Sequence, residues 1–277
     1  MRIDSHQHFW SLSRGDYAWL TPDLGIIFRD FGADDLRPIL QRHKIDATIV
    51  VQAAPTIAET EFMLDLARRA DFVKGVVGWA DFEGKDAPDV IGRLAARDRL
   101  VGLRPMIQDI PDPEWMLRPA IEPAVAAMES AGLRFDALLK PPHLQPFLKF
   151  LRQYPNLSIV VDHGAKPDIR NDGFAAWAPA MREIARDERV FCKLSGLITE
   201  AKADWQVDDL RRYIDHLVAC FGPGRLMWGS DWPVANLAGG YDRWMQASEA
   251  CLSSLGGDEQ AAIFGGTAAR FYGLVAA

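Results

Sequence analysis

Cysteine is scarce in this sequence. The 277 residues contain three cysteines, Cys192, Cys220 and Cys251, and no two of them stand at Cys-x-x-Cys spacing. So few cysteines argue against a disulfide framework, and the missing spacing argues against a structural zinc site built from thiolates. We therefore expect a fold held by its hydrophobic core, for which a hydrophobic fraction of 49% and nine tryptophans supply the material.

Positive charge is also in short supply. Lys and Arg number 31 against 38 Asp and Glu, which gives a formal net charge of −7, and no basic run or stripe stands out. This balance argues against nucleic acid or an anionic membrane surface as a partner. No run of membrane-spanning length and no apolar segment after a basic start is present, so we expect a cytoplasmic protein. The expected partner is a small-molecule substrate, and a homo-oligomer is left open.

A glycine-rich phosphate loop is missing after the first predicted strand, where the sequence reads His6-Gln7-His8. That loop is typical of a doubly wound open sheet, which is the alternative fold. Eight apolar segments instead alternate with amphipathic ones, as parallel strands covered on both faces by helices do. The predicted strands are Arg2–His8, Ala47–Ala53, Val73–Asp81, Val101–Gln108, Phe135–Lys140, Leu157–His163, Val190–Ser195 and Leu226–Asp231.

Helix-like segments follow these strands. They include Glu59–Arg69, Ala87–Arg97, Glu114–Ala131 and Asp208–Phe221. Strands that alternate with helices are joined by right-handed crossovers, and eight such units in 277 residues match the usual size of an α/β barrel. We therefore predict fold class α/β, with a (β/α)8 TIM barrel that forms a single domain over residues 1–277.

Two histidines, His6 and His8, stand one residue apart at the end of the first predicted strand. Side chains on a strand alternate between its two faces, so both imidazoles point toward the inside of whatever the strand helps to close. Two converging imidazoles are typical of a metal-ligand pair or of a clamp for a polar substrate. The chain is therefore predicted to be an enzyme.

The other predicted strands also end in side chains that hydrogen-bond or carry charge. This set comprises Gln52, Trp79, Asp81, Arg104, Gln108, Lys140, His143, Asp162, His163, Lys193, Ser195, Ser230 and Asp231. Active sites of α/β barrels gather at these strand ends. Because buried charges are costly unless they are paired or bind a ligand, a ring of such groups indicates a site for chemistry.

Five short segments, spread over almost the whole chain, carry a family resemblance. They are Ile3–Trp10, Gly102–Arg104 with Gln108–Asp109, Val161–Pro167, Cys192–Leu197 and Trp228–Pro233. With these segments the chain resembles the amidohydrolase superfamily, in the metal-dependent-hydrolase branch that contains the L-fuconolactonase and L-rhamnonolactonase group. The 2-pyrone-4,6-dicarboxylate lactonases are more distantly similar.

The resemblance implies a site core made of His6, His8, His163 and Asp231. Three imidazoles and a carboxylate also suit a divalent ion such as Zn²⁺. Superfamily members that hold a metal firmly usually add a Lys or Glu from strand four or a His from strand five, where this chain offers Arg104, Lys140 and His143. His143 is open to three interpretations, as a ligand, a substrate contact or a helix-start residue. We therefore expect any divalent metal to be loosely held or absent.

The mechanism that this set of residues favours is hydrolysis of a cyclic ester. Asp231 would take a proton from water and return it to the leaving ring oxygen, while the three histidines polarise the carbonyl. Arg104 and Lys140 extend from adjacent strands and are predicted to meet over one carbonyl or carboxylate. Lys193 either stabilises the negative charge of the intermediate or of the released carboxylate, or forms an ion pair with Asp162.

A sugar-like substrate fits the remaining candidates. Indole faces for the C–H face of a polyol ring are offered by Trp10, Trp19, Trp79, Trp228 and Trp232. Gln52, Gln108 and Ser195 can bond the hydroxyls of that ring. The predicted reaction is the opening of a small aldono-1,4- or 1,5-lactone to its aldonic acid. Two alternatives stay open, a metal-dependent non-oxidative decarboxylase of the same superfamily and a non-catalytic barrel that only binds a ligand.

Overall fold

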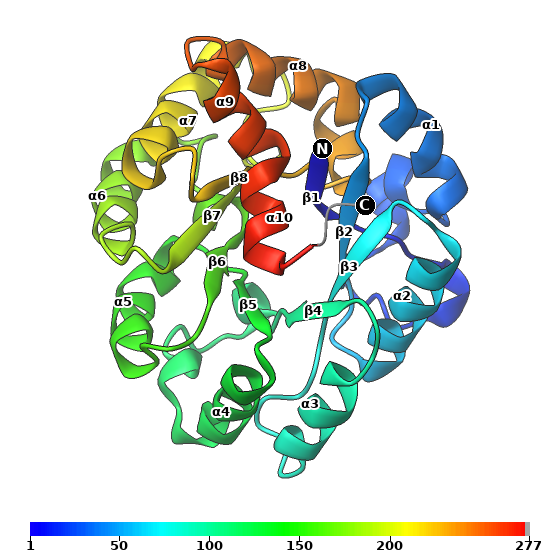
Figure 1. Ribbon diagram of the computed structural model, residues 1–277. Helices are drawn as coiled ribbons and strands as arrows, with labels where there is room; N and C mark the ends of the chain where they lie inside the picture. The colour runs from blue at the N-terminus through cyan, green and yellow to red at the C-terminus, as the bar shows by residue number, and fades with distance from the viewer. Residues whose placement is uncertain (275–277) are drawn as a thin grey trace.

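Eight parallel strands form one sheet in the order β1 to β8 in this computed structural model, which describes residues 1–274 (Figure 1). The strands are β1 Ile3–Gln7, β2 Ala47–Val51, β3 Val73–Gly78, β4 Leu100–Leu103, β5 Arg134–Ala137, β6 Ile159–Val161, β7 Val190–Leu194 and β8 Leu226–Trp228. The chain after β8 returns to β1, where Asp231 N donates to His6 O at 2.8 Å and His8 N donates to Trp232 O at 2.7 Å. These bonds bring the two ends of the sheet together, so the predicted TIM barrel is confirmed.

Helices surround the strands as an outer ring (Figure 1). The ring consists of α1 Ala33–His43, α2 Ile57–Arg69, α3 Ala87–Ala95, α4 Glu122–Ala131, α5 Leu144–Gln153, α6 Phe174–Ile184, α7 Val207–Phe221 and α8 Gly240–Leu252, and it is followed by α9 Gly257–Ala261 and α10 Thr267–Tyr272. Within residues 1–274, no helix has the length and apolarity that crossing a lipid bilayer requires.

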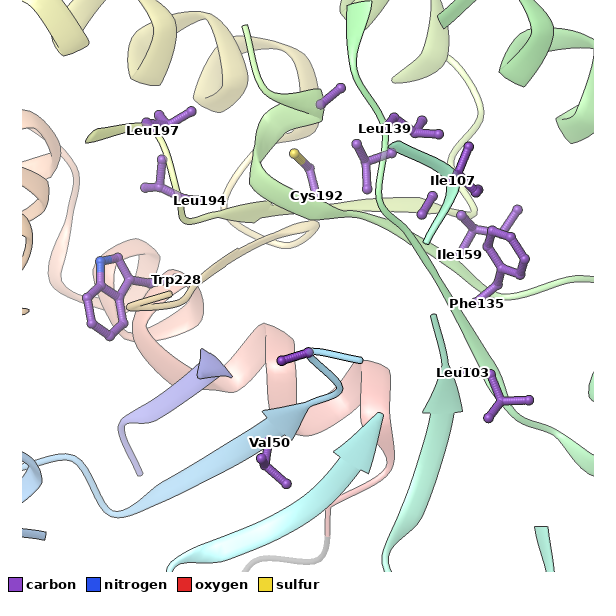
Figure 2. Close-up of a cluster of buried hydrophobic side chains, with 14 of the residues drawn as sticks. Val50, Leu103, Ile107, Phe135, Leu139, Ile159, Cys192, Leu194, Leu197 and Trp228 are labelled. Carbon is purple, nitrogen blue, oxygen red and sulfur yellow. The ribbon is translucent and has the colours of Figure 1, made fainter. Parts of the chain in front are cut away.

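Alternation along the strands separates two apolar layers. Ile49 and Val51 of β2 belong to the cluster inside the barrel, whereas Val50 between them packs in the larger core between strands and helices. Figure 2 shows Val50, Leu103 and Trp228 pointing away from the barrel interior toward that outer layer. This burial on both faces is why the strands are apolar at nearly every position.

The last helix, α10, lies across one end of the barrel (Figure 1). Ala268, Phe271 and Tyr272 pack there with apolar side chains from inside the strands. The Tyr272 hydroxyl donates to Asp136 Oδ2 on β5 at 2.8 Å. The C-terminal helix therefore contacts both the apolar and the polar interior of the barrel.

Two boundary predictions were wrong because of proline. The expected helix over Glu114–Ala131 begins only at Glu122, since Arg118 before Pro119 is extended, with φ −69° and ψ 134°. Most strands are also shorter than predicted. The expected strand Val101–Gln108 is hydrogen-bonded over Leu100–Leu103, and Pro105, which lacks an N–H, follows it.

Candidate active site

A cavity of about 160 Å³ lies among the residues that follow the C-terminal ends of the strands. It is lined by His8, Trp19, Ala53, Arg104, Met106, Gln108, Asp109, Leu138, His163, Lys166, Asp231 and Val234. Pockets for drug-sized ligands are usually about 300–1,000 Å³. The cavity therefore suits a small molecule.

The Asp231 carboxylate is the centre of the polar wall. Its Oδ1 lies 3.2 Å from His8 Nε2 and 3.9 Å from both His6 Nε2 and His163 Nε2. All four side chains are buried, with Asp231 4% exposed. Three imidazoles, from β1, the residue after it and the turn after β6, thus converge on one carboxylate oxygen beyond β8.

The protonation state of His8 follows from its partners. His8 Nδ1 lies 2.7 Å from Val51 O, and since a carbonyl only accepts, Nδ1 carries a proton. In the neutral ring, Nε2 then presents a lone pair to Asp231 Oδ1 at 3.2 Å. A proton taken up by either of these two atoms would therefore be shared between them.

His6 has the opposite arrangement. Its Nδ1 lies 3.1 Å from the Lys193 ammonium, which only donates, so Nδ1 accepts and the neutral ring carries its proton on Nε2. Burial, together with the Lys193 charge, holds the pKa of His6 well below its usual range. In this tautomer Nε2 lies 3.9 Å from Asp231 Oδ1 and 3.5 Å from an Arg104 guanidinium nitrogen, while Nδ1 also lies 3.5 Å from Asp162 Oδ1.

His163 lies in an unusual turn. It is the first of four consecutive residues with positive φ, which run from 47° to 60° over His163–Lys166. Its Nδ1 bonds Ser195 Oγ at 2.9 Å, and burial lowers the pKa of the ring well below its usual range. Gly196 leaves room for this ring, because a Cβ on Gly196 would lie 2.5 Å from His163 Nδ1.

The electrostatics keep Asp231 ionised. Burial alone would raise the pKa of this carboxyl, but attraction to His163 and the contact with His8 outweigh it and lower the pKa. A buried carboxylate with a lone pair directed at a small cavity is suited to accept a proton from a bound water.

A divalent metal fits part of this cluster. One ligand atom each from His6, His163 and Asp231 lies within 4.8 Å of the others, and imidazole nitrogen with carboxylate oxygen is a zinc-type donor set. Of the four residues predicted as ligands, His8 contacts the group through Asp231. The proton on His6 Nε2 would have to leave before that atom could bind a metal.

Arg104, Gln52 and Lys193 are held by other protein groups. Arg104 lines the cavity, but its guanidinium donates to Gln52 O and lies 3.4 Å from Asp162 Oδ2. Gln52 is fully buried and donates back to Arg104 O at 2.7 Å.

The Lys193 ammonium, also fully buried, contacts Asp136 at 2.5 Å and Asp162 at 3.1 Å. The ion pair of Lys193 with Asp162 is thus present, and neither Gln52 nor Lys193 lines the cavity.

Lys140 and His143 also lie outside the cavity lining. Lys140 is exposed and donates to Gln108 O at 3.2 Å, while His143 Nδ1 accepts from Lys140 N at 3.0 Å. Of the three interpretations of His143, this contact matches the helix-start residue, because it fastens the turn that precedes α5. The expected meeting of Arg104 and Lys140 over one carbonyl is not seen. Gln108 does line the cavity.

Trp79 and Trp232, which were predicted to contact the substrate, do not line this cavity. Trp79 lines a second cavity of about 250 Å³, which shares Met106 and Asp109 with the first. Trp232 is buried and packs edge-to-face on Phe31, with ring centroids 5.2 Å apart.

Trp19, one of the tryptophans expected to cover a sugar ring, does line the cavity, whereas Lys166 was not a candidate. Trp19 comes from the long segment between β1 and α1, and its Nε1 donates to Ala53 O at 2.7 Å. Lys166 comes from the left-handed turn that also holds His163. Lys166 belongs to the segment Val161–Pro167 that carried the family resemblance, which is the signal that could have identified it.

Comparisons with known proteins identify the family of the chain. The amidohydrolase family matches residues 3–274. An L-fucono-1,5-lactonase of Burkholderia ambifaria is 46% identical over 98% of this chain and 95% of its own length, and one of Burkholderia multivorans is 38% identical over 99% and 96%. A crystal structure of a Burkholderia multivorans amidohydrolase with bound zinc superposes with a TM-score of 0.93, at 36% identity, over 99% of this chain and 100% of that one. Because these matches run over nearly the whole length, the chain belongs to the amidohydrolase family.

Proposed function

We propose that the protein is a sugar lactonase that opens L-fucono-1,5-lactone, or an aldonolactone of similar shape, to its aldonic acid. The observation that carries this proposal is the Asp231 carboxylate, with three imidazoles 3.2–3.9 Å from one of its oxygens, at the wall of a small cavity. The names of the two relatives at 46% and 38% identity support the choice of substrate.

Asp231 starts the reaction as the base. Its carboxylate takes a proton from water as the oxygen of that water bonds to the lactone carbonyl carbon. The proton rests between Asp231 Oδ1 and His8 Nε2, which lie 3.2 Å apart. When the ring C–O bond breaks, the same proton passes to the departing ring oxygen, so Asp231 is restored and a hydroxy acid is released.

The oxyanion of the tetrahedral intermediate needs donors. Arg104 lines the cavity, and its guanidinium is the group we propose for this role, with His6 Nε2 lying 3.5 Å behind it. His6, His163 and Asp231 would hold a divalent cation, which when bound supplies polarisation of the carbonyl.

The decarboxylase alternative is not favoured. The relatives that match at 38% and 46% identity are lactonases by name, whereas structures of decarboxylases match at 13–14% identity, which shows the fold alone. His143, the strand-five histidine that such a reaction would use, is bonded to Lys140 N and does not line the cavity.

A panel of 1,4- and 1,5-aldonolactones tests the proposal. Acid release is followed with a pH indicator, and spontaneous hydrolysis is subtracted with enzyme-free samples. We expect the fastest turnover with L-fucono-1,5-lactone. If no aldonolactone is opened and an aromatic carboxylic acid releases CO₂, the decarboxylase alternative replaces the lactonase. If neither compound reacts, the non-catalytic barrel replaces it.

A further inference from the structure

The cationic side chains near the cavity differ in how many hydrogen bonds and ion pairs they already make with other protein groups. Arg104 is 3% exposed, donates to Gln52 O and lies near Asp162. Lys193 is fully buried against Asp136 and Asp162. Lys140 is exposed, bonds Gln108 O and does not line the cavity. Each of these three charges is therefore engaged by another group or directed elsewhere.

Lys166 differs from them in its position. Its side chain lines the cavity and is 20% exposed. Among residues 1–274, the carboxylate that pairs with its ammonium is that of Glu200, at 3.8 Å, which is near the outer limit for an ion pair. Neither that distance nor a half-buried setting makes a strong pair.

The backbone turn that presents Lys166 is costly. His163, Ala165 and Lys166 adopt φ of 54°, 60° and 47°, and a left-handed conformation costs a residue with a Cβ roughly 1–2 kcal/mol. Strain of this kind persists where the surroundings hold it, and it gathers at functional sites. The same turn places both His163 and Lys166 at the cavity wall. Burial is the main cause of the lowered pKa of His163, and the Lys166 charge contributes to it.

We propose that Lys166 is the residue that binds the carboxylate of the aldonate product, by exchanging its loose partner Glu200 for that carboxylate. This inference rests on the proposed function, because it takes an aldonate as the ligand. A hydroxy acid is ionised at neutral pH, so ring opening creates a negative charge that the neutral lactone lacks. A cation with a weak internal partner at the cavity wall can receive that charge without a large loss of existing contacts.

Binding of sodium L-fuconate and of the uncharged L-fuconamide, measured by titration calorimetry, tests this role. Lys166→Met should raise the Kd for L-fuconate by about tenfold or more and change that for the amide by less than about twofold, because only the acid carries the charge. Lys166→Arg should retain most of the affinity. The matched control is Lys149→Met on α5, which also removes a Lys–Glu ion pair, with Glu114, but lies outside the cavity lining.

A second variant separates a binding role from a structural one. Glu200→Gln removes the internal competitor of Lys166, so it should tighten L-fuconate binding severalfold. If the ion pair only supported the fold, Lys166→Met and Glu200→Gln would weaken binding alike, and that result would overturn the proposal. The proposal would also be overturned if wild-type protein bound L-fuconate no better than the amide.

Lactone hydrolysis is measured in parallel so that the two proposals fail separately. Wild-type protein that binds L-fuconate through Lys166 but opens no lactone leaves this inference standing and removes the lactonase. Active enzyme whose inhibition by L-fuconate is unchanged in Lys166→Met removes this inference and keeps the lactonase.

Discussion

At the scale of single residues, the site depends on which atom carries each proton. Val51 O fixes the proton of His8 on Nδ1, and the Lys193 ammonium moves that of His6 to Nε2. Asp231 therefore meets one imidazole lone pair and one imidazole N–H. The first completes a base that can hold the proton taken from water, and the second adds a donor to the same wall.

Replacing Asp231 with Asn should lower lactone turnover by about 10²–10⁴-fold, which is the usual contribution of a positioned general base. The amide keeps the shape of the side chain but cannot take the proton. The measurement is kcat for L-fucono-1,5-lactone, with circular dichroism to verify the fold. Turnover close to that of wild type would remove Asp231 from the mechanism.

Metal removal should have a small effect. His6 Nε2 carries a proton in its present hydrogen-bond arrangement, so a cation must displace that proton to gain this ligand. We expect chelation to change turnover by less than about threefold and metal analysis to give less than one ion per chain. Full inactivation by a chelator that added zinc reverses would contradict this expectation.

Glu59 makes stability depend on pH. Burial raises the pKa of this carboxyl from 4.5 to about 7, although Ala54 N and Ala53 N donate to it. Because the native pKa lies above the unfolded one, its contribution to stability is complete below pH 4.5 and is lost as the pH rises through 7.

Glu59→Gln should therefore become more stable relative to wild type by up to about 3 kcal/mol between pH 4.5 and 7.5. Urea unfolding at several pH values measures this difference. Glu61→Gln, on the same helix but with a side chain 40% exposed, corrects for the loss of one negative charge. A difference in stability that stays constant with pH would show that Glu59 is not the cause.

At the scale of structural elements, the left-handed turn after β6 and the glycine after β7 act as a pair. Gly196 has φ +62°, and a Cβ there would lie 2.5 Å from His163 Nδ1 and 3.2 Å from Asp231 Oδ2. The close approach of these two loops therefore depends on the absence of a side chain at one position.

Gly196→Ala should reduce lactone turnover by at least about tenfold, since a shift of about 1 Å in a catalytic group can cost far more. Backbone strain should also lower the free energy of unfolding by about 1–2 kcal/mol. Gly132→Ala is the matched control, because Gly132 has φ +67° but no atom within 4 Å of its would-be Cβ. The control should show the loss of stability without the loss of turnover, and equal turnover in both variants would refute the steric argument.

The sequence predicted these elements better than it predicted the turns between them. Apolar runs located all eight strands, and period-two alternation correctly directed His6 and His8 to one side. Lys166 escaped prediction because its position depends on consecutive left-handed residues, a conformation that His, Ala and Lys do not favour locally. Lys140 was misplaced because strand alternation stops at Ala137, three residues before it.

At the scale of the whole molecule, a chain of polar contacts runs from the bottom of the barrel to the site. Tyr272 on α10 donates to Asp136 on β5, Asp136 pairs with Lys193 on β7, and Lys193 donates to His6 on β1. Every member of this chain is buried. The C-terminal helix thereby helps to hold a residue at the opposite end of the strands.

Tyr272→Phe should lower the free energy of unfolding by about 1–3 kcal/mol, because it takes a donor from a buried carboxylate. Urea denaturation measures this loss. Tyr154→Phe serves as the comparison and should cost less, since within residues 1–274 the Tyr154 hydroxyl accepts a hydrogen bond only from the Gln153 amide, at 3.3 Å. A Tyr272→Phe protein as stable as Tyr154→Phe would show that the contact with Asp136 contributes nothing.

A ribosome synthesises α10 after all eight strands, so the nascent barrel stays uncovered at one end until Tyr272 emerges. During that interval Ile3, Val77 and Met227, which pack in the cluster with α10, have no cover on that side. Transiently exposed apolar surface of this kind makes a partly folded chain prone to aggregation. Cover of these side chains by α10 therefore comes late in synthesis, after every strand that it packs against.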